Sequence, residues 1–143
     1  MKYLLDTCIL SETVRPKPDL NVLRWFQMTD RTLMYTPAVV LGEIRKGVVK
    51  LEDGRRKTML EEWLNQYRQN FAQKIVPFDI EVAQKWGTLV GELQLKGISL
   101  PVIDSQIAAT ALEHGMVLVT RNEKDFEHTG VQMLNPFNFM SKQ

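Results

Sequence analysis

PVIDSQIAATALEHGMVLVT, residues 101–120, joins one predicted helix to one predicted strand. Proline at its first position and Gly115 just past its helical part are typical helix boundaries, and the apolar residues between them recur at helical spacing. MVLV, residues 116–119, is a short apolar run that stops at Thr120, as expected of a buried strand with a polar carboxyl end. The stretch therefore indicates a helix–strand unit of the kind that builds parallel sheets.

Similar elements lie on both sides of this stretch. YLL, residues 3–5, is an apolar run that stops at an aspartate, residues 32–36 and 74–76 are each closed by a proline, and residues 131–134 are a candidate edge strand. Helical spacing lies between the strands at 36–47, 60–71, 83–93 and 101–114, and KLEDGRRK, residues 50–57, indicates the turn of a helical hairpin. We therefore predict an α/β fold with a mostly parallel central sheet of about five short strands flanked by helices.

The length and composition indicate one globular domain. A chain of 143 residues fits a single domain, which we expect over residues 1–143. Hydrophobic residues make up 44% and charged residues 24%, which is typical of globular proteins and argues against a disordered or coiled-coil chain. Because 18 basic residues face 17 acidic ones, any contact with nucleic acid has to come from local patches.

Cysteine and hydropathy patterns point to a reducing compartment. Cys8 is the only cysteine, and neither it nor the two histidines have the spacing of a zinc site. The apolar run at the N-terminus is broken by Asp6, and no stretch approaches the ~18 apolar residues that a membrane crossing needs. We therefore expect a cytoplasmic protein without a membrane segment.

Acidic residues occupy the positions where a parallel sheet forms its sites. Asp6 directly follows the first strand and Asp125 lies in the loop after the 116–119 strand, at the strand ends where such sheets bind ligands. Asp104 lies in the first turn of a helix, and Glu43 lies among apolar helical neighbours. Gathered carboxylates repel one another unless a cation neutralises them, which favours a Mg²⁺ or Mn²⁺ site. Each acid alone is equally compatible with a cap or surface role, so the spacing leaves both interpretations open.

Four motifs, in this order along the chain, resemble the PIN-domain family and within it the VapC and FitB-like toxins of bacterial toxin–antitoxin pairs. They are MKYLLDTCILSE, TPAVVLGEIRKG, PVIDSQIAATALEHG and LVTRNEKDF, and the resemblance runs nearly from end to end. It implies a PIN-like parallel sheet flanked by helices and a metal-dependent ribonuclease activity. It also implies a cognate antitoxin protein, whose basic side chain reaches the acidic cleft, and a homodimer.

The same resemblance implies the roles of particular residues. Asp6, Glu43 and Asp104 correspond to the acids that hold Mg²⁺ or Mn²⁺ and serve catalysis. Many PIN domains carry aspartate where this chain has Asn122, and the TRNxxDF form suggests that Asp125 provides the fourth carboxylate instead. Thr120 and Asn122 would then support the site through hydrogen bonds.

Two functional interpretations follow from the resemblance. The first is hydrolysis of an RNA phosphodiester by a metal-activated water, because neither histidine lies at a predicted acid position to assist attack by the RNA's own 2′-hydroxyl. The alternative is a catalytically inactive PIN-fold binding module in a protein complex. Acids in all four motifs favour the ribonuclease.

Other chemistry-bearing residues have simpler interpretations. Cys8 has no histidine base nearby in the sequence, so we expect it to be a small buried apolar residue. Trp63, Tyr67 and Trp86 lie at helical core spacing and are predicted to pack. A solvated helix face is the simpler interpretation of the basic residues near the Glu43 helix and the hairpin turn, although some could follow a phosphate backbone toward the acids: Arg45, Lys46, Lys50, Arg55, Arg56 and Lys57.

Overall fold

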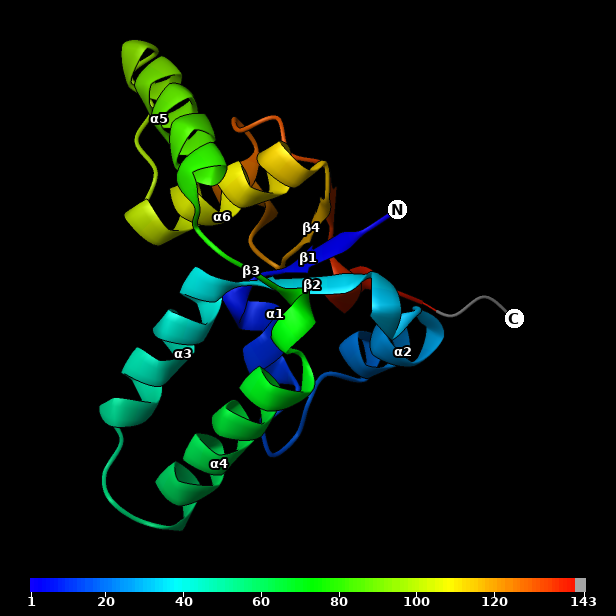
Figure 1. Ribbon diagram of the computed structural model, residues 1–143. Helices are drawn as coiled ribbons and strands as arrows, with labels where there is room; N and C mark the ends of the chain where they lie inside the picture. The colour runs from blue at the N-terminus through cyan, green and yellow to red at the C-terminus, as the bar shows by residue number, and fades with distance from the viewer. Residues whose placement is uncertain (141–143) are drawn as a thin grey trace.

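The computed structural model describes residues 1–140, and within them five parallel strands form one sheet in the order β3-β2-β1-β4-β5 (Figure 1). The strands are β1 (Tyr3–Leu5), β2 (Met34–Pro37), β3 (Ile75–Val76), β4 (Val117–Val119) and β5 (Met133–Leu134). The predicted parallel sheet is confirmed, with β5 at an edge as expected. Because these strands are so short, every residue in them lies close to one of the two edges of the sheet where the strands end.

Helices cover both faces of this sheet. They are α1 (Thr7–Glu12), α2 (Leu20–Met28), α3 (Ala38–Val49), α4 (Arg55–Asn70), α5 (Ile80–Leu95) and α6 (Val102–His114). Figure 1 shows α5 and α6 packed together on one side and α1, α2 and α4 on the other, with α3 and α4 forming the predicted hairpin. α6 begins after Pro101 and ends at Gly115, which adopts the left-handed conformation that glycine allows at a helix end (φ 62°).

Some element boundaries differ from the sequence prediction. The strand predicted from residue 32 begins at Met34, because the carboxylate of Asp30 accepts the backbone N–H of Thr32 at 2.9 Å and caps a 3₁₀ turn over Arg31–Leu33. α1 and α2 were not predicted. Their 6 and 9 residues are too few for a periodic apolar pattern to stand out, and a side-chain cap starts each of them.

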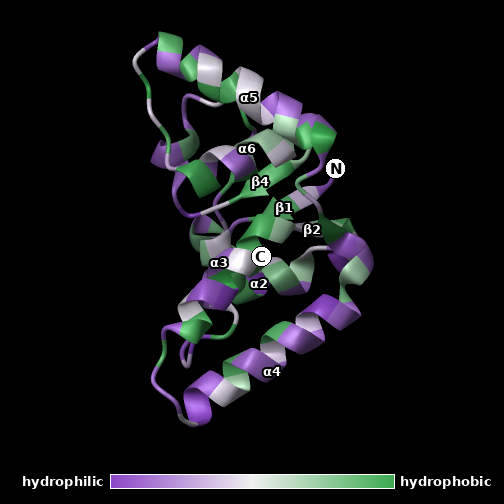
Figure 2. Ribbon diagram, turned by 60° about the vertical axis from the view of Figure 1, so that its left-hand side comes forward, coloured by the Kyte–Doolittle hydropathy of each residue, from purple (hydrophilic) through white to green (hydrophobic). Residues whose placement is uncertain are grey.

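The core lies where the two central strands meet the helices. Leu4 of β1 and Leu118 of β4 are fully buried, and they belong to the same core cluster as the buried Trp25 of α2 and Phe126. Figure 2 shows the strands as an apolar centre enclosed by helices with hydrophilic outer faces. Burial on both faces explains why these strands are continuous apolar runs rather than alternating ones. None of the helices in the part of the chain described here is long and apolar enough to cross a membrane.

Candidate active site

The pairing of β1 with β4 brings two polar residues together at the carboxyl edge of the sheet. Leu5 pairs with Val119, and the Asp6 backbone N–H continues the ladder by donating to the Val119 carbonyl at 3.0 Å. The next residue on β4's side is Thr120, whose hydroxyl donates to Asp6 Oδ2 at 2.7 Å. Two segments more than a hundred residues apart therefore meet at one carboxylate.

Asp6 is held in a fixed position by its neighbours. Its side chain is 4% exposed, and its Oδ1 accepts the Thr7 backbone N–H at 2.7 Å, which makes Asp6 the cap of α1. Thr120 is fully buried and also accepts the Asn122 backbone N–H at 3.0 Å, so the loop after β4 is tied to the same point. A carboxylate fixed in this way cannot rotate away from the cleft without breaking two charge-assisted hydrogen bonds.

Burial raises the pKa of Asp6 above its usual value. Hydrogen bonds from Thr120, Thr7 and Cys8 oppose this effect because they stabilise the charged form, and the negative charge of Asp125 adds a further rise. The net shift is upward. Asp6 is therefore a carboxylate whose charge is only partly compensated by the protein itself.

Asp104 connects the acids electrostatically. It lies in the first turn of α6 and is partly buried, and its pKa is raised from 3.8 to about 6. Burial is the largest cause, and the charges of Asp6, Asp125 and Glu43 follow in that order. Each of the other three predicted acids thus contributes to the environment of Asp104, which is the behaviour expected of carboxylates around one cleft.

The four carboxylates do not form a closed coordination shell. Glu43 lies on α3 with its Oε2 3.0 Å from the Nζ of Lys46, so this carboxylate pairs with a lysine one turn further on. Asp125 is exposed in the 3₁₀ turn Glu123–Phe126. Among residues 1–140, no three acidic, histidine or cysteine side chains lie close enough together to hold one metal ion. The four acids are therefore close enough to affect one another's charge, but no three of them are close enough in this structure to bind the same ion.

The two residues predicted to support the site take part in different ways. Thr120 donates its hydroxyl proton to Asp6, as described above. Asn122 contributes through its backbone, donating its N–H to Thr120 and accepting the Asp125 N–H at 3.0 Å through its carbonyl. These bonds connect Asp125 to Asp6 through a continuous chain of Thr120 and Asn122.

Cys8 does not have the purely apolar role expected from the sequence. It is half-buried, and its Sγ lies 3.6 Å from Asp6 Oδ2 and 4.0 Å from Thr120 Oγ1. Burial and the charge of Asp6 raise the thiol pKa to about 11, so Cys8 stays protonated and donates a weak hydrogen bond. Its position two residues after Asp6, in the first turn of α1, is the signal that the sequence interpretation missed.

The donor set suits a hard divalent cation in its chemistry. All four predicted ligands are carboxylates, and Mg²⁺ and Mn²⁺ prefer such oxygen donors. Each oxygen of Asp6 accepts one short hydrogen bond and keeps a further lone pair for a cation. Burial is the largest cause of the raised pKa values of Asp6 and Asp104, and neighbouring carboxylates raise both further, so a bound cation would stabilise their charged forms.

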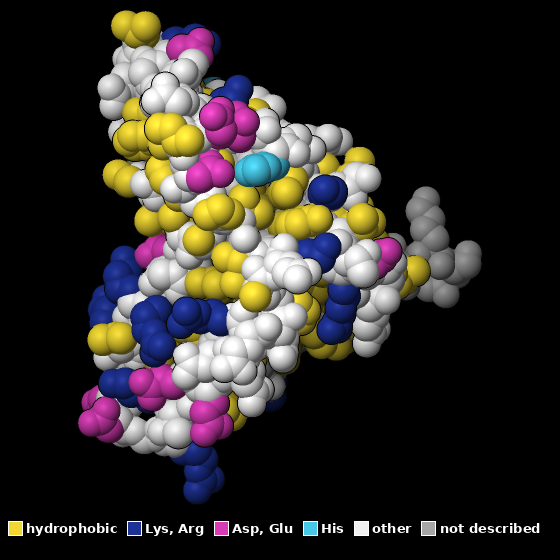
Figure 3. Space-filling model, viewed as in Figure 1, with side chains coloured by type: hydrophobic (Ala, Val, Ile, Leu, Met, Phe, Trp, Pro, Cys, Tyr) yellow, Lys and Arg dark blue, Asp and Glu magenta, His cyan; other side chains and the backbone are white. Residues whose placement is uncertain are grey.

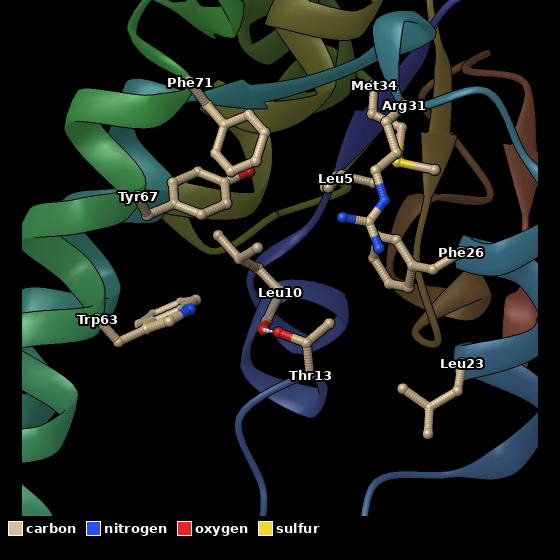
Figure 4. Close-up of a pocket in the computed structure, with 10 residues that line it drawn as sticks. All are labelled: Leu5, Leu10, Thr13, Leu23, Phe26, Arg31, Met34, Trp63, Tyr67 and Phe71. Atoms are coloured by element: carbon tan, nitrogen blue, oxygen red, sulfur yellow. Dashed lines mark hydrogen bonds between the residues drawn. The ribbon is translucent and has the colours of Figure 1, made fainter.

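A separate apolar cavity of about 340 Å³ lies between α1, α2 and α4 (Figure 4). Trp63 and Tyr67 of α4 and Phe71, which directly follows that helix, line one side of the cavity, and Leu10 of α1 lies opposite. Arg31 is the one charged residue in the lining. None of the four acids lines this cavity. Trp63 and Tyr67 pack as predicted, with ring centroids 5.7 Å apart.

The comparisons with known proteins agree with this architecture. Residues 3–132 match the family described as PIN domain. The chain is 34% identical to the toxin FitB of Neisseria gonorrhoeae over 94% of this chain and 98% of that protein, and 30% identical to VapC ribonuclease Y4jK of Sinorhizobium fredii over 94% and 96%. Among solved structures, FitAcB from Neisseria gonorrhoeae superimposes with a TM-score of 0.89 at 33% identity over 96% of this chain and 99% of that one. The structure of FitAB bound to a DNA fragment gives 0.88 at 32% identity over 99% of both chains. The sheet order, the acids at its carboxyl edge and these matches together establish that this chain belongs to the PIN-domain family.

Proposed function

We propose that this protein is a metal-dependent ribonuclease and the toxin of a toxin–antitoxin pair. The observation that supports this most directly is that acids from four segments act on one another: Asp6, Asp125 and Glu43 all raise the pKa of Asp104, in addition to its burial, which is the largest cause. Relatives named as ribonucleases and toxins match the chain over nearly its whole length. A binding module without turnover would have no need for four acidic side chains that repel one another.

In the proposed site, Asp6, Glu43, Asp104 and Asp125 bind one or two Mg²⁺ or Mn²⁺ ions. A bound divalent cation would supply a more acidic water and stabilise negative charge on the phosphate. Asp6 serves as the fixed ligand, because Thr120 and the Thr7 N–H hold both of its oxygens. Glu43 has to exchange its contact with Lys46 for the cation, so we expect it to be the weakest of the four ligands.

A nuclease assay tests the proposal directly. Wild-type protein should cleave RNA with Mn²⁺ or Mg²⁺ and lose activity in EDTA, and Asp104→Asn should be inactive under all conditions. Mass spectrometry should find 5′-phosphate and 3′-hydroxyl ends, as expected from attack by water. Full activity in EDTA, or 2′,3′-cyclic phosphate ends, would contradict the four-acid mechanism, and absence of cleavage under every condition would favour the binding module.

We further propose that the protein forms a homodimer and binds an antitoxin with a basic side chain directed at the acids. Two solved structures that are similar to this chain are the FitAB complex bound to a DNA fragment and FitAcB from Neisseria gonorrhoeae. An arginine would form charge-assisted hydrogen bonds with carboxylates that otherwise repel one another. Light scattering of the isolated protein should give twice the 16.5 kDa of one chain, and a constant 16.5 kDa at micromolar concentrations would contradict the dimer.

A further inference from the structure

A groove of about 310 Å³ runs away from the acids between α1, α3 and α4. α1 and α3 directly follow β1 and β2, so both helices start at the carboxyl edge of the sheet and extend away from it. Thr7 of α1 and Glu43 of α3 line the groove near that edge, and its lining also includes Arg15, from the loop after α1, and Arg56, from the first turn of α4. The groove is therefore continuous with the candidate active site.

Two guanidinium groups give the distal part of the groove its charge. Arg15 lies 3.3 Å from the carboxylate of Glu12, and its side chain is 60% exposed. Arg56 donates from Nη2 to the Val14 carbonyl at 2.9 Å and is also exposed. Each contact uses one of the five N–H donors of a guanidinium, so several donors remain for an anion.

The walls between the acids and the guanidinium groups are apolar. They are formed by one aromatic and several aliphatic side chains, namely Trp63, Val14, Ile44, Val48, Leu51 and Leu60. Gly47 lines the groove as well, and the space where its side chain would project is open to 4 Å. The volume is at the lower end of the ~300–1,000 Å³ typical of small-ligand sites, which is enough for a group the size of a nucleotide.

We propose that this groove binds the RNA nucleotide next to the cleaved phosphodiester, with its base on the apolar walls and its phosphate on Arg15 and Arg56. Single-stranded nucleic acids bind where cationic groups and aromatic or apolar surfaces alternate, and the groove combines both beside the acids. The proposal rests on the proposed ribonuclease function and names a substrate subsite for it.

The surrounding basic residues are less suited to this role. Figure 3 shows Lys and Arg side chains gathered over α3 and α4 on one face of the molecule. Lys57 is engaged with Asp53 at 3.2 Å and with the Val49 carbonyl at 3.3 Å, and Lys46 is paired with Glu43. Of the six basic residues considered from the sequence, Arg56 is the one that lines this groove.

The test compares two double variants of equal charge. Arg15→Gln/Arg56→Gln removes both guanidinium groups from the groove, and Arg24→Gln/Lys85→Gln removes two exposed positive charges from α2 and α5 outside it. For a short single-stranded RNA in Mn²⁺, the groove variant should have a KM raised ~10-fold with kcat little changed, as expected when charge-assisted phosphate contacts are lost. The control variant should keep the wild-type KM.

Binding without cleavage provides an independent measurement. In EDTA, the slope of log Kd against log salt concentration should be shallower in the groove variant by about 0.7 for each phosphate contact removed. RNA carrying 4-thiouridine beside the cleaved position should cross-link to peptides of α1, α3 or α4. Thermal melts of both variants establish that they are folded.

Several results would overturn the proposal. Wild-type KM and salt slope in the groove variant, while wild-type protein cleaves RNA with Mn²⁺, would remove the subsite and leave the ribonuclease function standing. Unchanged RNA binding together with weakened antitoxin binding would make the groove a protein-binding site instead. Absence of cleavage by the wild-type protein would contradict the proposed function. The salt dependence of RNA binding in EDTA would still show whether Arg15 and Arg56 of the groove contact RNA phosphates.

Discussion

Replacing Asp104 by asparagine should stabilise the metal-free protein at neutral pH. The folded protein raises the pKa of this carboxyl from 3.8 to about 6, so its charged form is disfavoured in the fold relative to the unfolded chain. A shift of this size corresponds to about 3 kcal/mol, and partial solvent exposure reduces it to about 1–2 kcal/mol. Asparagine also loses about 0.5 kcal/mol of favourable interaction with the N-terminus of α6. The expected net gain is about 1 kcal/mol, or about 3 °C in Tm for a chain of this size.

The sign of the effect depends on pH in a defined way. Below about pH 3 the Asp104 carboxyl is mostly protonated in both the folded and the unfolded state, so the charge contributes almost no penalty. As pH rises from about 3 through 6, the unfolded chain loses this proton more readily than the folded protein, and wild-type stability falls relative to the variant. The gain of Asp104→Asn should therefore be full at pH 7.5 and nearly absent at about pH 3.

Urea denaturation and thermal melts in EDTA at both pH values measure this difference. Glu92→Gln on α5 is the matched control, because it removes an exposed carboxylate that is not among the charges acting on Asp104. Saturating Mn²⁺ should reverse the order, stabilising the wild type more than Asp104→Asn. A variant that is less stable than wild type at pH 7.5, or equally stabilised at about pH 3 and pH 7.5, would refute the electrostatic reasoning and make Asp104 a structural residue.

Further predictions concern the hydrogen bonds of Asp6 with its neighbours and the hydrogen bond that joins Tyr67 of α4 to Thr36. Thr120→Val removes the buried hydroxyl that donates to Asp6. We expect it to lower the unfolding free energy by about 1–3 kcal/mol and to raise the pKa of Asp6 in an NMR titration, and Thr120→Ser should largely restore both. Tyr67→Phe removes the 2.6 Å hydrogen bond to the buried hydroxyl of Thr36 and should lower the unfolding free energy in urea by about 1–2 kcal/mol. Adding Thr36→Val should recover much of that loss. If the effects of the two substitutions are strictly additive, the two hydroxyls do not stabilise the fold as a pair. Cys8, with its pKa raised to about 11, should react with a thiol reagent at pH 8 far more slowly in the folded protein than in urea, and rapid native labelling would contradict its protonated state.

The fold class could be predicted from the sequence because its signals are local. The 101–120 stretch combines a helix start, a glycine helix end and an apolar strand within twenty residues, and the structure forms α6 and β4 there. Short helices were not predictable in the same way. α1 depends on Asp6 as its cap, while Asp6 is in turn held by Thr120 from β4, which no local window contains.

For the candidate site, too, some properties could be predicted from the local sequence and others depend on the fold. The residue types and the strand ends on which they lie are local properties, and by themselves they left a cap role and a metal site both open for the acids. The resemblance of four motifs to the PIN-domain family led to the prediction of four site acids and a supporting threonine. The sequence could not determine how charge is shared among them. The pKa of Asp104 depends on burial and on three carboxylates from distant segments, and Glu43 is drawn to Lys46.

Only the tertiary structure decided which basic and sulfur-containing groups belong near the acids. Arg56 and Arg15 line one groove because α4 folds back along α3 and contacts the loop after α1. The hydrogen bond from Arg56 to the Val14 carbonyl, for example, joins residues 42 positions apart. Cys8 becomes a hydrogen-bond donor because α1 turns its first residues toward the edge where β1 and β4 end. Periodicity and caps arise within a few residues and can be recognised in the sequence, whereas electrostatic and hydrogen-bonding environments arise from surfaces that meet only after the chain has folded.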